Sequence, residues 1–361
     1  MSAAIRHLDT LHPLAALDDA TLFVQAAFLG GRWITSETTV AVTDPATGET
    51  LGSIPALTAA DTSRAIDAAE AALPAWRALL PQERARILKR WNDLILASRE
   101  DLALLMTLEQ GKPLAESRGE IDYAASFVDY YAEEARRIAV EGLTSHLPNA
   151  QMTLTRVPLG VVGLVTPWNF PAAMLTRKAA AALAAGCTTV AHPSSETPFS
   201  ALALAALAER AGMPAGVFNV VTGNAATIVG RLCEDSRVRA MSFTGSTEIG
   251  RLIAAQAAPT VKRLIMELGG HAPLMIFADS DLDRAVDIAM DAKFATSGQD
   301  CLAANRIYVE RSIYEPFLAA FKARIEALAV GPGLDASTEI GPLMHARAIA
   351  KVEAQVHDAV G

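Results

Sequence analysis

Short valine-rich runs alternate with helical stretches through the middle of the chain, and this alternation limits the possible folds most strongly. The apolar runs have the length of buried strands, and they lie at 160–165, 187–191, 217–221, 240–243 and 273–277. Stretches with helical spacing separate them, at 172–185, 199–211, 225–234 and 247–257. Strands joined by crossover helices form a parallel sheet, because a tight turn cannot connect parallel neighbours. We therefore predict an α/β fold built on a parallel sheet.

The first part of the chain has a different pattern. Residues 1–30 are a weakly patterned leader. Strand-like runs follow at 33–34, 39–42 and 51–54. Long helices are expected next, with starts at Asp61, Pro81 and Glu116. The first of them is expected to end before Pro74, because a proline inside a helix removes a hydrogen bond and crowds the preceding turn.

Size and composition indicate a globular protein of two domains. The chain has 361 residues, of which 51% are hydrophobic and 20% charged. The net charge of −9 argues against nucleic acid as a partner, because phosphate binding needs a basic face. The longest apolar stretch, 179–191, is too short to span a bilayer, and no secretory signal pattern begins the chain. The three cysteines suggest neither a disulfide framework nor a zinc site, so we expect a soluble, cytoplasmic protein without a metal.

A carboxylate and a thiol stand beside glycines in two separate motifs. Glu267 precedes Gly269 and Gly270, and Cys301 follows Gly298 closely. A thiolate is a strong nucleophile and a carboxylate can serve as a general base, so the pair could form and hydrolyse a thioester. Glu267 could be a strand-end carboxylate in a pocket or merely a solvated loop acid. Cys301 could equally be a buried structural cysteine, which is the more common fate of an isolated thiol.

Two further motifs follow predicted strands. Thr166-Pro167-Trp168-Asn169-Phe170-Pro171 comes after the strand at 160–165, and in open α/β sheets ligands bind at this carboxyl edge. The Asn169 amide could stabilise an oxyanion there, or Asn169 could simply cap the next helix. The run 243–250 starts another helix, whose free amides suit a pyrophosphate, although a simple cap explains it equally well. The usual dinucleotide fingerprint, G-x-G-x-x-G, is absent.

In combination these motifs resemble the aldehyde dehydrogenase family and, within it, the succinate-semialdehyde dehydrogenases. The resemblance begins at Gly31 and runs nearly to the end of the chain. Its markers occur in the order typical of the family, at 108–114, 166–171, 176–178, 198–201, 243–250, 267–270 and 298–301. Several motifs in one order are far more specific than any single motif.

The resemblance implies a domain organisation. A Rossmann-type parallel-sheet cofactor domain would comprise 31–148 and 160–268, and an oligomerisation hairpin would lie at 149–159. Residues 269–361 would form an α/β catalytic domain that is incomplete, because members of the family continue well past the position of Gly361. The hairpin implies a homo-oligomer.

The resemblance also implies the chemistry, which is oxidation of an aldehyde to the carboxylic acid with NADP or NAD. Cys301 would attack the aldehyde carbon, and Asn169 with the amide of Cys301 would bind the oxyanion of the thiohemiacetal. Glu267 would activate the water that hydrolyses the thioester. Arg177 would bind a substrate carboxylate.

The positions implied for cofactor binding are Thr166, Pro167, Trp168, His192, Ser195, Gly245, Ser246 and Leu268. Two of them bear on affinity and selectivity. His192 replaces a lysine that holds the cofactor ribose in the family, and a mostly neutral imidazole should weaken binding. Ser195 stands where NAD-preferring relatives often carry a glutamate that repels a 2′-phosphate, so we expect NADP to be preferred.

Other departures from the family pattern concern substrate and activity. Succinate-semialdehyde enzymes carry an arginine at the position of Ala295, so only part of their carboxylate clamp is present. This opens glutarate semialdehyde, or another aldehyde, as an alternative substrate. Asp300 precedes the nucleophile and should raise the pKa of its thiol. Asp300, His192 and the incomplete catalytic domain together support an alternative interpretation, in which the chain is a homologue with little or no activity.

Overall fold

The computed structural model describes residues 13–361, and its centre is a sheet with the strand order β11-β10-β7-β8-β9-β1-β2. Its parallel strands are β7 (Val161–Val165), β8 (Thr188–His192), β9 (Phe218–Val220), β10 (Val238–Thr244) and β11 (Arg263–Glu267). Two antiparallel strands complete one edge, β1 (Ala27–Leu29) and β2 (Arg32–Ile34). The predicted parallel sheet is therefore confirmed.

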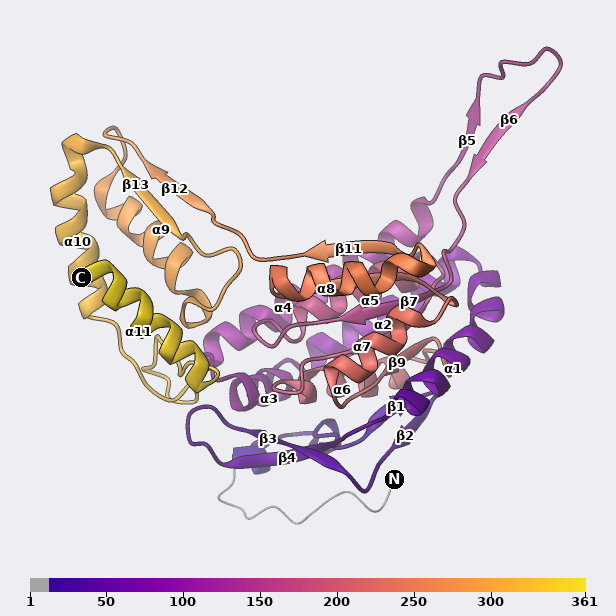
Figure 1. Ribbon diagram of the computed structural model, residues 1–361, viewed down its shortest axis with the longest axis horizontal. Helices are drawn as coiled ribbons and strands as arrows, with labels where there is room; N and C mark the ends of the chain where they lie inside the picture. The colour runs from indigo at the N-terminus through magenta and orange to yellow at the C-terminus, as the bar shows by residue number, and fades with distance from the viewer. Residues whose placement is uncertain (1–12) are drawn as a thin grey trace.

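Helices cover both faces of the sheet (Figure 1). One face carries α5 (Ala173–Ala184) and α6 (Pro198–Arg210), and over them lies an outer layer of α2 (Pro81–Ala97), α3 (Arg99–Gln110) and α4 (Leu114–Glu134). The other face carries α1 (Ala59–Ala78), α7 (Ala225–Glu234) and α8 (Thr247–Ala257). This is the layered arrangement expected when crossover helices connect parallel strands.

The central strand β7 divides its side chains between two cores. Val162 and Leu164 pack with α2 to α6, whereas Val161 and Val165 pack with α1, α7 and α8. All its residues are buried, which explains a continuous apolar run where a half-exposed strand would alternate with polar residues.

Three local expectations were wrong. The helix α1 continues through Pro74 to Ala78, because Trp76 is buried at its end and its indole N–H donates to the carbonyl of Leu183 at 3.2 Å. Strand β1 lies inside the supposed leader, of which residues 1–12 fall outside the described part of the chain. Strand β11 was missing from the expected strands, although one interpretation of Glu267 placed it at a strand end; its residues are mostly exposed at the edge of the sheet, and its apolar run is only three residues long.

A second, smaller unit follows β11. It contains β12 (Pro273–Ile276) paired in parallel with β13 (Arg306–Val309), and the helices α9 (Leu282–Phe294) and α10 (Tyr314–Glu326). Ile276, Val286 and Phe317 are buried in its own core. The predicted strand at 273–277 thus exists but belongs to this separate sheet. The last helix, α11 (Ala346–Val360), lies between the two units in Figure 1.

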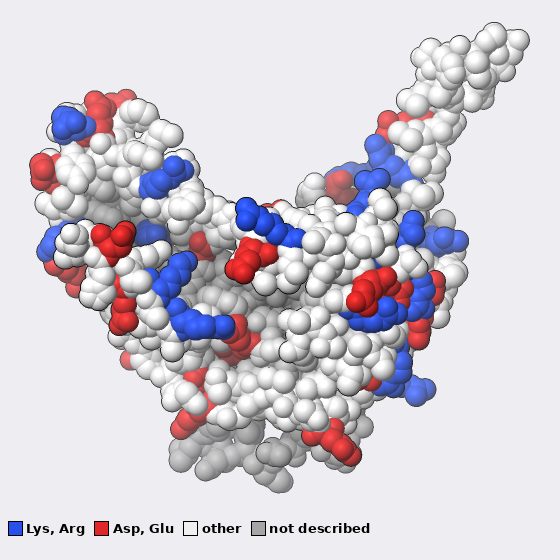
Figure 2. Space-filling model, in the orientation of Figure 1, with Lys and Arg blue, Asp and Glu red and all other residues white. Residues whose placement is uncertain are grey.

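A two-stranded hairpin projects from the body of the molecule (Figure 1). Its strands are β5 (Val140–Leu143) and β6 (Met152–Thr155), so the range 149–159 covers only its second half. Val140, Leu143 and Leu154 are exposed on it. Figure 2 shows charged side chains at its base and none on the outer half. Another hairpin, β3 (Thr39–Thr43) with β4 (Thr50–Pro55), lies beside the sheet. Over residues 13–361, no helix combines the length and apolar character needed to cross a membrane.

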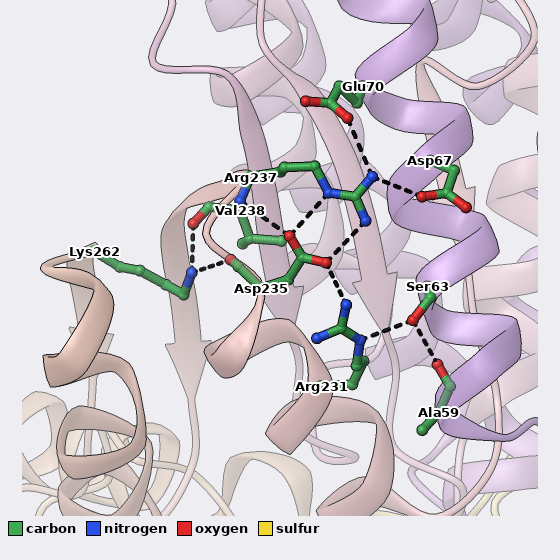
Figure 3. Close-up of polar contacts among 9 residues, drawn as sticks. All are labelled: Ala59, Ser63, Asp67, Glu70, Arg231, Asp235, Arg237, Val238 and Lys262. Carbon is green, nitrogen blue, oxygen red and sulfur yellow. Dashed lines mark hydrogen bonds and ion pairs between the residues drawn. The ribbon is translucent and has the colours of Figure 1, made fainter.

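An ionic network fixes the sheet edge opposite to the carboxyl ends of the parallel strands (Figure 3). The buried carboxylate of Asp235 accepts hydrogen bonds from Arg231 at 2.6 Å and from Nη2 of Arg237 at 2.9 Å. Arg237 also contacts Asp67 of α1 at 2.6 Å. The hydrogen bonds from Arg237 hold the pKa of Asp235 down to about 2. Asp235 thereby connects α7, β10 and α1.

We expect Asp235→Asn to lower the free energy of unfolding at pH 7 by about 2 kcal/mol, since charge-assisted hydrogen bonds are lost. The pKa of Asp235 is depressed in the fold, so its contribution is complete above the ordinary value of 3.8 and disappears as the pH falls toward about 2. Urea unfolding at several pH values measures the difference. Asp67→Asn, which removes a more exposed partner, should have a smaller effect. Equal stability of Asp235→Asn and the parent at pH 7 would contradict the assignment.

Candidate active site at the carboxyl edge of the sheet

Four neighbouring parallel strands, β11, β10, β7 and β8, have polar residues at or just after their carboxyl ends, and these residues lie in one row. Thr244, the last residue of β10, pairs with Glu267, the last residue of β11. On the other side β10 pairs with β7, and Thr166 directly follows β7. The amide of Thr166 donates to the carbonyl of His192, at the end of β8, at 3.2 Å. Glu267 is therefore a strand-end carboxylate, as one of the two interpretations held.

The loop that carries Cys301 reaches this row from the smaller unit. It follows the short 3₁₀ helix at Ala295–Gly298. The side-chain amide of Asn169 donates to the carbonyl of Gln299 at 2.7 Å. A Cβ placed on Gly270 would lie 3.8 Å from the carbonyl oxygen of Cys301. The structure thus brings the motifs of Asn169, Glu267 and Cys301 to one place.

Asn169 keeps part of its amide free for a ligand. An asparagine amide has two N–H groups, and the contact with Gln299 uses one of them. The backbone carbonyl of Asn169 is bound as well, by the ammonium of Lys112 at 2.8 Å. Asn169 is therefore held from two sides, and its second side-chain N–H has no hydrogen-bond partner among residues 13–361.

Cys301 is a free, exposed residue whose thiol stays protonated more readily than an ordinary thiol. Partial burial of its sulfur raises the pKa first, and the carboxylates of Asp300 and Glu267 raise it further. Asp300 also accepts a hydrogen bond from the amide of Leu302 at 2.9 Å, so it folds around the cysteine. The sequence predicted that Asp300 would raise the pKa of this thiol, and the shift in the structure has the same direction.

Lys178 lies in a stretch that the family resemblance places in the cofactor cleft, without a separate role for its amine. It lies on α5 and is buried, and burial together with the charge of Arg177 lowers its pKa to about 8, while Glu267 opposes the shift. A partly deprotonated amine near Glu267 can accept or release a proton at neutral pH. The only signal in the sequence was the marker at 176–178.

Part of the row fits a polar cofactor. The hydroxyls of Thr166 and Thr244 are buried, and neither has a hydrogen-bond partner among residues 13–361. Buried hydroxyls are rarely left unpaired, so a ligand group is a fitting partner. Ser246 caps α8, accepting from the amide of Ile249 at 3.3 Å. Leu268 packs on Gly250, where an added Cβ would lie 2.6 Å from a Leu268 methyl carbon.

His192 does not supply a charge to this region. It is 2% exposed, its Nδ1 lies 3.0 Å from the carbonyl of Val221, and burial lowers its pKa. A neutral ring whose N–H donates to a carbonyl is therefore the stable form. Ser195 donates to the carbonyl of Gly223 at 3.1 Å and is half-buried.

The start of α11 borders the same region. The rings of Trp168 and His345 are 5.9 Å apart at a steep angle. His345 and Arg347 each bring a side-chain nitrogen to 3.9 Å from the carboxylate of Glu196. No sequence motif indicated these contacts, because they join residues far apart along the chain.

A cavity of about 530 Å³ lies between α4 and the smaller unit, and its lining includes Phe170, Phe294 and Ala295. Arg177 is not part of this lining. Its guanidinium lies 5.0 Å from the ring centroid of Phe127. The structure thus places Ala295 at the cavity wall and Arg177 outside it.

We expect Asp300→Asn to lower the pKa of the Cys301 thiol and to speed its alkylation at neutral pH, because a repulsive carboxylate is removed. The measurement is the pH dependence of iodoacetamide labelling at Cys301, followed by mass spectrometry. Asp291→Asn is the matched control, because Asp291 is not among the groups that shift the thiol. An unchanged midpoint in Asp300→Asn would refute the role of this carboxylate.

Comparison with known proteins shows the family of the chain. The sequence profile of the Aldehyde dehydrogenase family matches residues 33–361. A glutarate-semialdehyde dehydrogenase of Pseudomonas aeruginosa is 52% identical over 95% of this chain and 72% of its own length. The NADP(+) succinate-semialdehyde dehydrogenase GabD of Escherichia coli is 51% identical over the same shares. A crystal structure described as an E. coli NADP-dependent enzyme superposes with a TM-score of 0.94 at 51% identity, covering 95% of this chain and 72% of that one. The chain therefore belongs to the aldehyde dehydrogenase family and is an NAD(P)-dependent aldehyde dehydrogenase.

Proposed function

We propose that this enzyme oxidises a semialdehyde that carries a carboxylate, with succinate semialdehyde as the first candidate. The observation that carries the proposal is the meeting of Asn169, Glu267 and Cys301 at the carboxyl edge of the sheet, through the 2.7 Å contact between Asn169 and Gln299. A nucleophile, an oxyanion donor and a base in one place suit thioester chemistry.

The proposed reaction begins when the thiol of Cys301 loses its proton, with Glu267 and Asp300 as the nearby carboxylates. The thiolate then adds to the aldehyde carbon. The free N–H of Asn169 and the amide of Cys301 bind the oxyanion of the thiohemiacetal. The thiohemiacetal becomes a thioester when its carbon loses a hydride, and NAD(P)+, when bound, would supply the acceptor for that hydride. Glu267 then takes a proton from the water that hydrolyses the Cys301 thioester to the acid.

Arg177 is the proposed partner of the substrate carboxylate. Within residues 13–361 no ion pair engages its guanidinium, which rests on Phe127 and approaches the sulfur of Met174 at 3.9 Å. The relatives compared above act, by their names, on succinate or glutarate semialdehyde. Glutarate semialdehyde is the second candidate, because Ala295 at the cavity wall leaves room that an arginine would fill.

The hairpin of β5 and β6 supports a proposal of self-association. It exposes Val140, Leu143 and Leu154 on a projecting ribbon, and Val157 beyond it is 75% exposed. An isolated ribbon with exposed apolar side chains is poorly stable in water and is stabilised when another surface covers it. We infer that a second copy of the chain covers it in a homo-oligomer.

Purified protein should reduce NAD(P)+ with succinate or glutarate semialdehyde, and Cys301→Ala should abolish this, while Cys233→Ala should not. Arg177→Gln should raise the KM for both semialdehydes by about 10-fold, the effect of losing roughly one charged contact, and should leave propionaldehyde nearly unaffected. Steady-state kinetics by nicotinamide absorbance measure both effects. Absence of turnover in the parent protein would favour the alternative of a homologue with little or no activity.

We further infer that NADP is the preferred cofactor, because Ser195 brings no charge near the expected site of the 2′-phosphate. Ser195→Glu should weaken NADP binding by about 10-fold or more through like-charge repulsion and should leave NAD binding nearly unchanged. Fluorescence titration with both cofactors provides the Kd ratio. Ser195→Ala is the control, since it removes the hydroxyl without adding a charge. Equal Kd values for NADP in both variants would contradict the placement of Ser195.

A further inference from the structure

A group of three charged residues, two of them buried and the third partly buried, lies where α3 ends and α4 begins. We call Lys112, Glu116 and Glu120 the charge cluster. Lys112 follows the left-handed Gly111 and is 1% exposed. Glu116 and Glu120 are one turn apart on α4 and so lie on the same face of the helix. All three residues line the 530 Å³ cavity.

One side of the charge cluster holds the loop of Asn169. The ammonium of Lys112 lies 2.5 Å from a carboxylate oxygen of Glu120 and 2.8 Å from the backbone carbonyl of Asn169. It also lies 4.3 Å from the ring centroid of Phe170. The second carboxylate oxygen of Glu120 accepts from the amides of Ala172 and Ala173, at 3.0 and 3.2 Å. The second half of the turn between β7 and α5, from Asn169 to Ala173, is therefore held by the charge cluster.

The other side of the charge cluster holds the loop of Cys301. Glu116 accepts from the amide of Thr296 at 2.7 Å, and burial raises the pKa of Glu116 while the charge of Lys112 opposes the shift. Thr296 and Ser297 have φ values of 53° and 55°, followed by Gly298 at 72°. Left-handed residues other than glycine are costly unless neighbouring contacts hold them. The bond from Glu116 is such a contact.

We propose that Lys112, Glu116 and Glu120 are positioning residues that fix the Asn169 loop and the Cys301 loop against each other. Lys112 is ion-paired with Glu120, and Glu116 lies one turn away from Glu120 on the same helix, so α4 carries both sets of contacts. The spacing between the Asn169 amide and the Cys301 sulfur is thereby set from outside the reacting groups. This rests on the proposed roles of Asn169 and Cys301. Displacement of an oxyanion donor by about 1 Å can reduce a rate about 100-fold.

The test compares Glu116→Ala with Glu116→Gln. The alanine removes the acceptor for the amide of Thr296, whereas the glutamine keeps an acceptor oxygen. We expect Glu116→Ala to lower kcat about 10- to 100-fold with a smaller change in KM, and Glu116→Gln to recover most of it. Asp122→Ala is the matched control on α4, because Asp122 makes only an exposed ion pair with Arg99 and should leave kcat unchanged.

Hydrogen-exchange mass spectrometry provides a second measurement that does not depend on turnover. Peptides covering 295–301 should exchange faster in Glu116→Ala and not in Glu116→Gln or Asp122→Ala. A Lys112→Met variant, if it folds, should loosen peptides covering 169–173 as well. If the parent protein has no activity but Glu116→Ala still exchanges faster than the parent over 295–301, the positioning role of the charge cluster is supported and the proposed function is refuted. Parent-like kcat in Glu116→Ala, or a loss that Glu116→Gln does not recover, would overturn the positioning role.

Discussion

The parallel pairing of β10 with β7 on one side and β11 on the other is the constraint on which the site depends. Parallel strands end at the same edge, so this pairing alone brings Thr166, Thr244 and Glu267 into one row. The register is fixed because β7 buries alternate residues in two different cores. A shift by one residue would exchange those faces, so the packing energy of Val162 and Leu164 also protects the geometry of the site.

The sheet defines only half of the site, and the other half depends on loop contacts. Cys301 comes from the smaller unit and has no strand of its own to set its position. Its loop is anchored through Gln299, whose side chain accepts from the amide of Met344 at 3.0 Å, and through Ser297, which donates to the carbonyl of Gly341 at 2.9 Å. Cys301, the proposed nucleophile, is therefore placed by contacts that neighbouring side chains of its loop make with other segments.

This division explains what the sequence could predict. Apolar runs report burial, so β7, β8, β9 and β10 were visible, whereas the exposed edge strand β11 was not. Pro74 was taken as a helix end because local rules carry no information about the burial of Trp76. For Glu267 the sequence left a strand end and a solvated loop open, and the pairing of β11 with β10 decides for the strand end. The hydrogen bond from Lys112 to the carbonyl of Asn169 joins residues that are distant in sequence, so no local sequence pattern could predict it.

The motif at 108–114 also shows that the outer helical layer does more than cover the sheet. Glu109 is fully buried and accepts from the amides of Phe199 and Ser200, at 2.7 and 2.8 Å, at the start of α6. Burial raises its pKa to about 8 against the effect of those bonds. Glu120 binds the start of α5 in the same way. Asn169 precedes α5 and Ser195 precedes α6. Glu120 and Glu109 of the outer helical layer therefore fix the position of both loops that leave the carboxyl edge of the sheet, because each binds the amides at the start of the following helix.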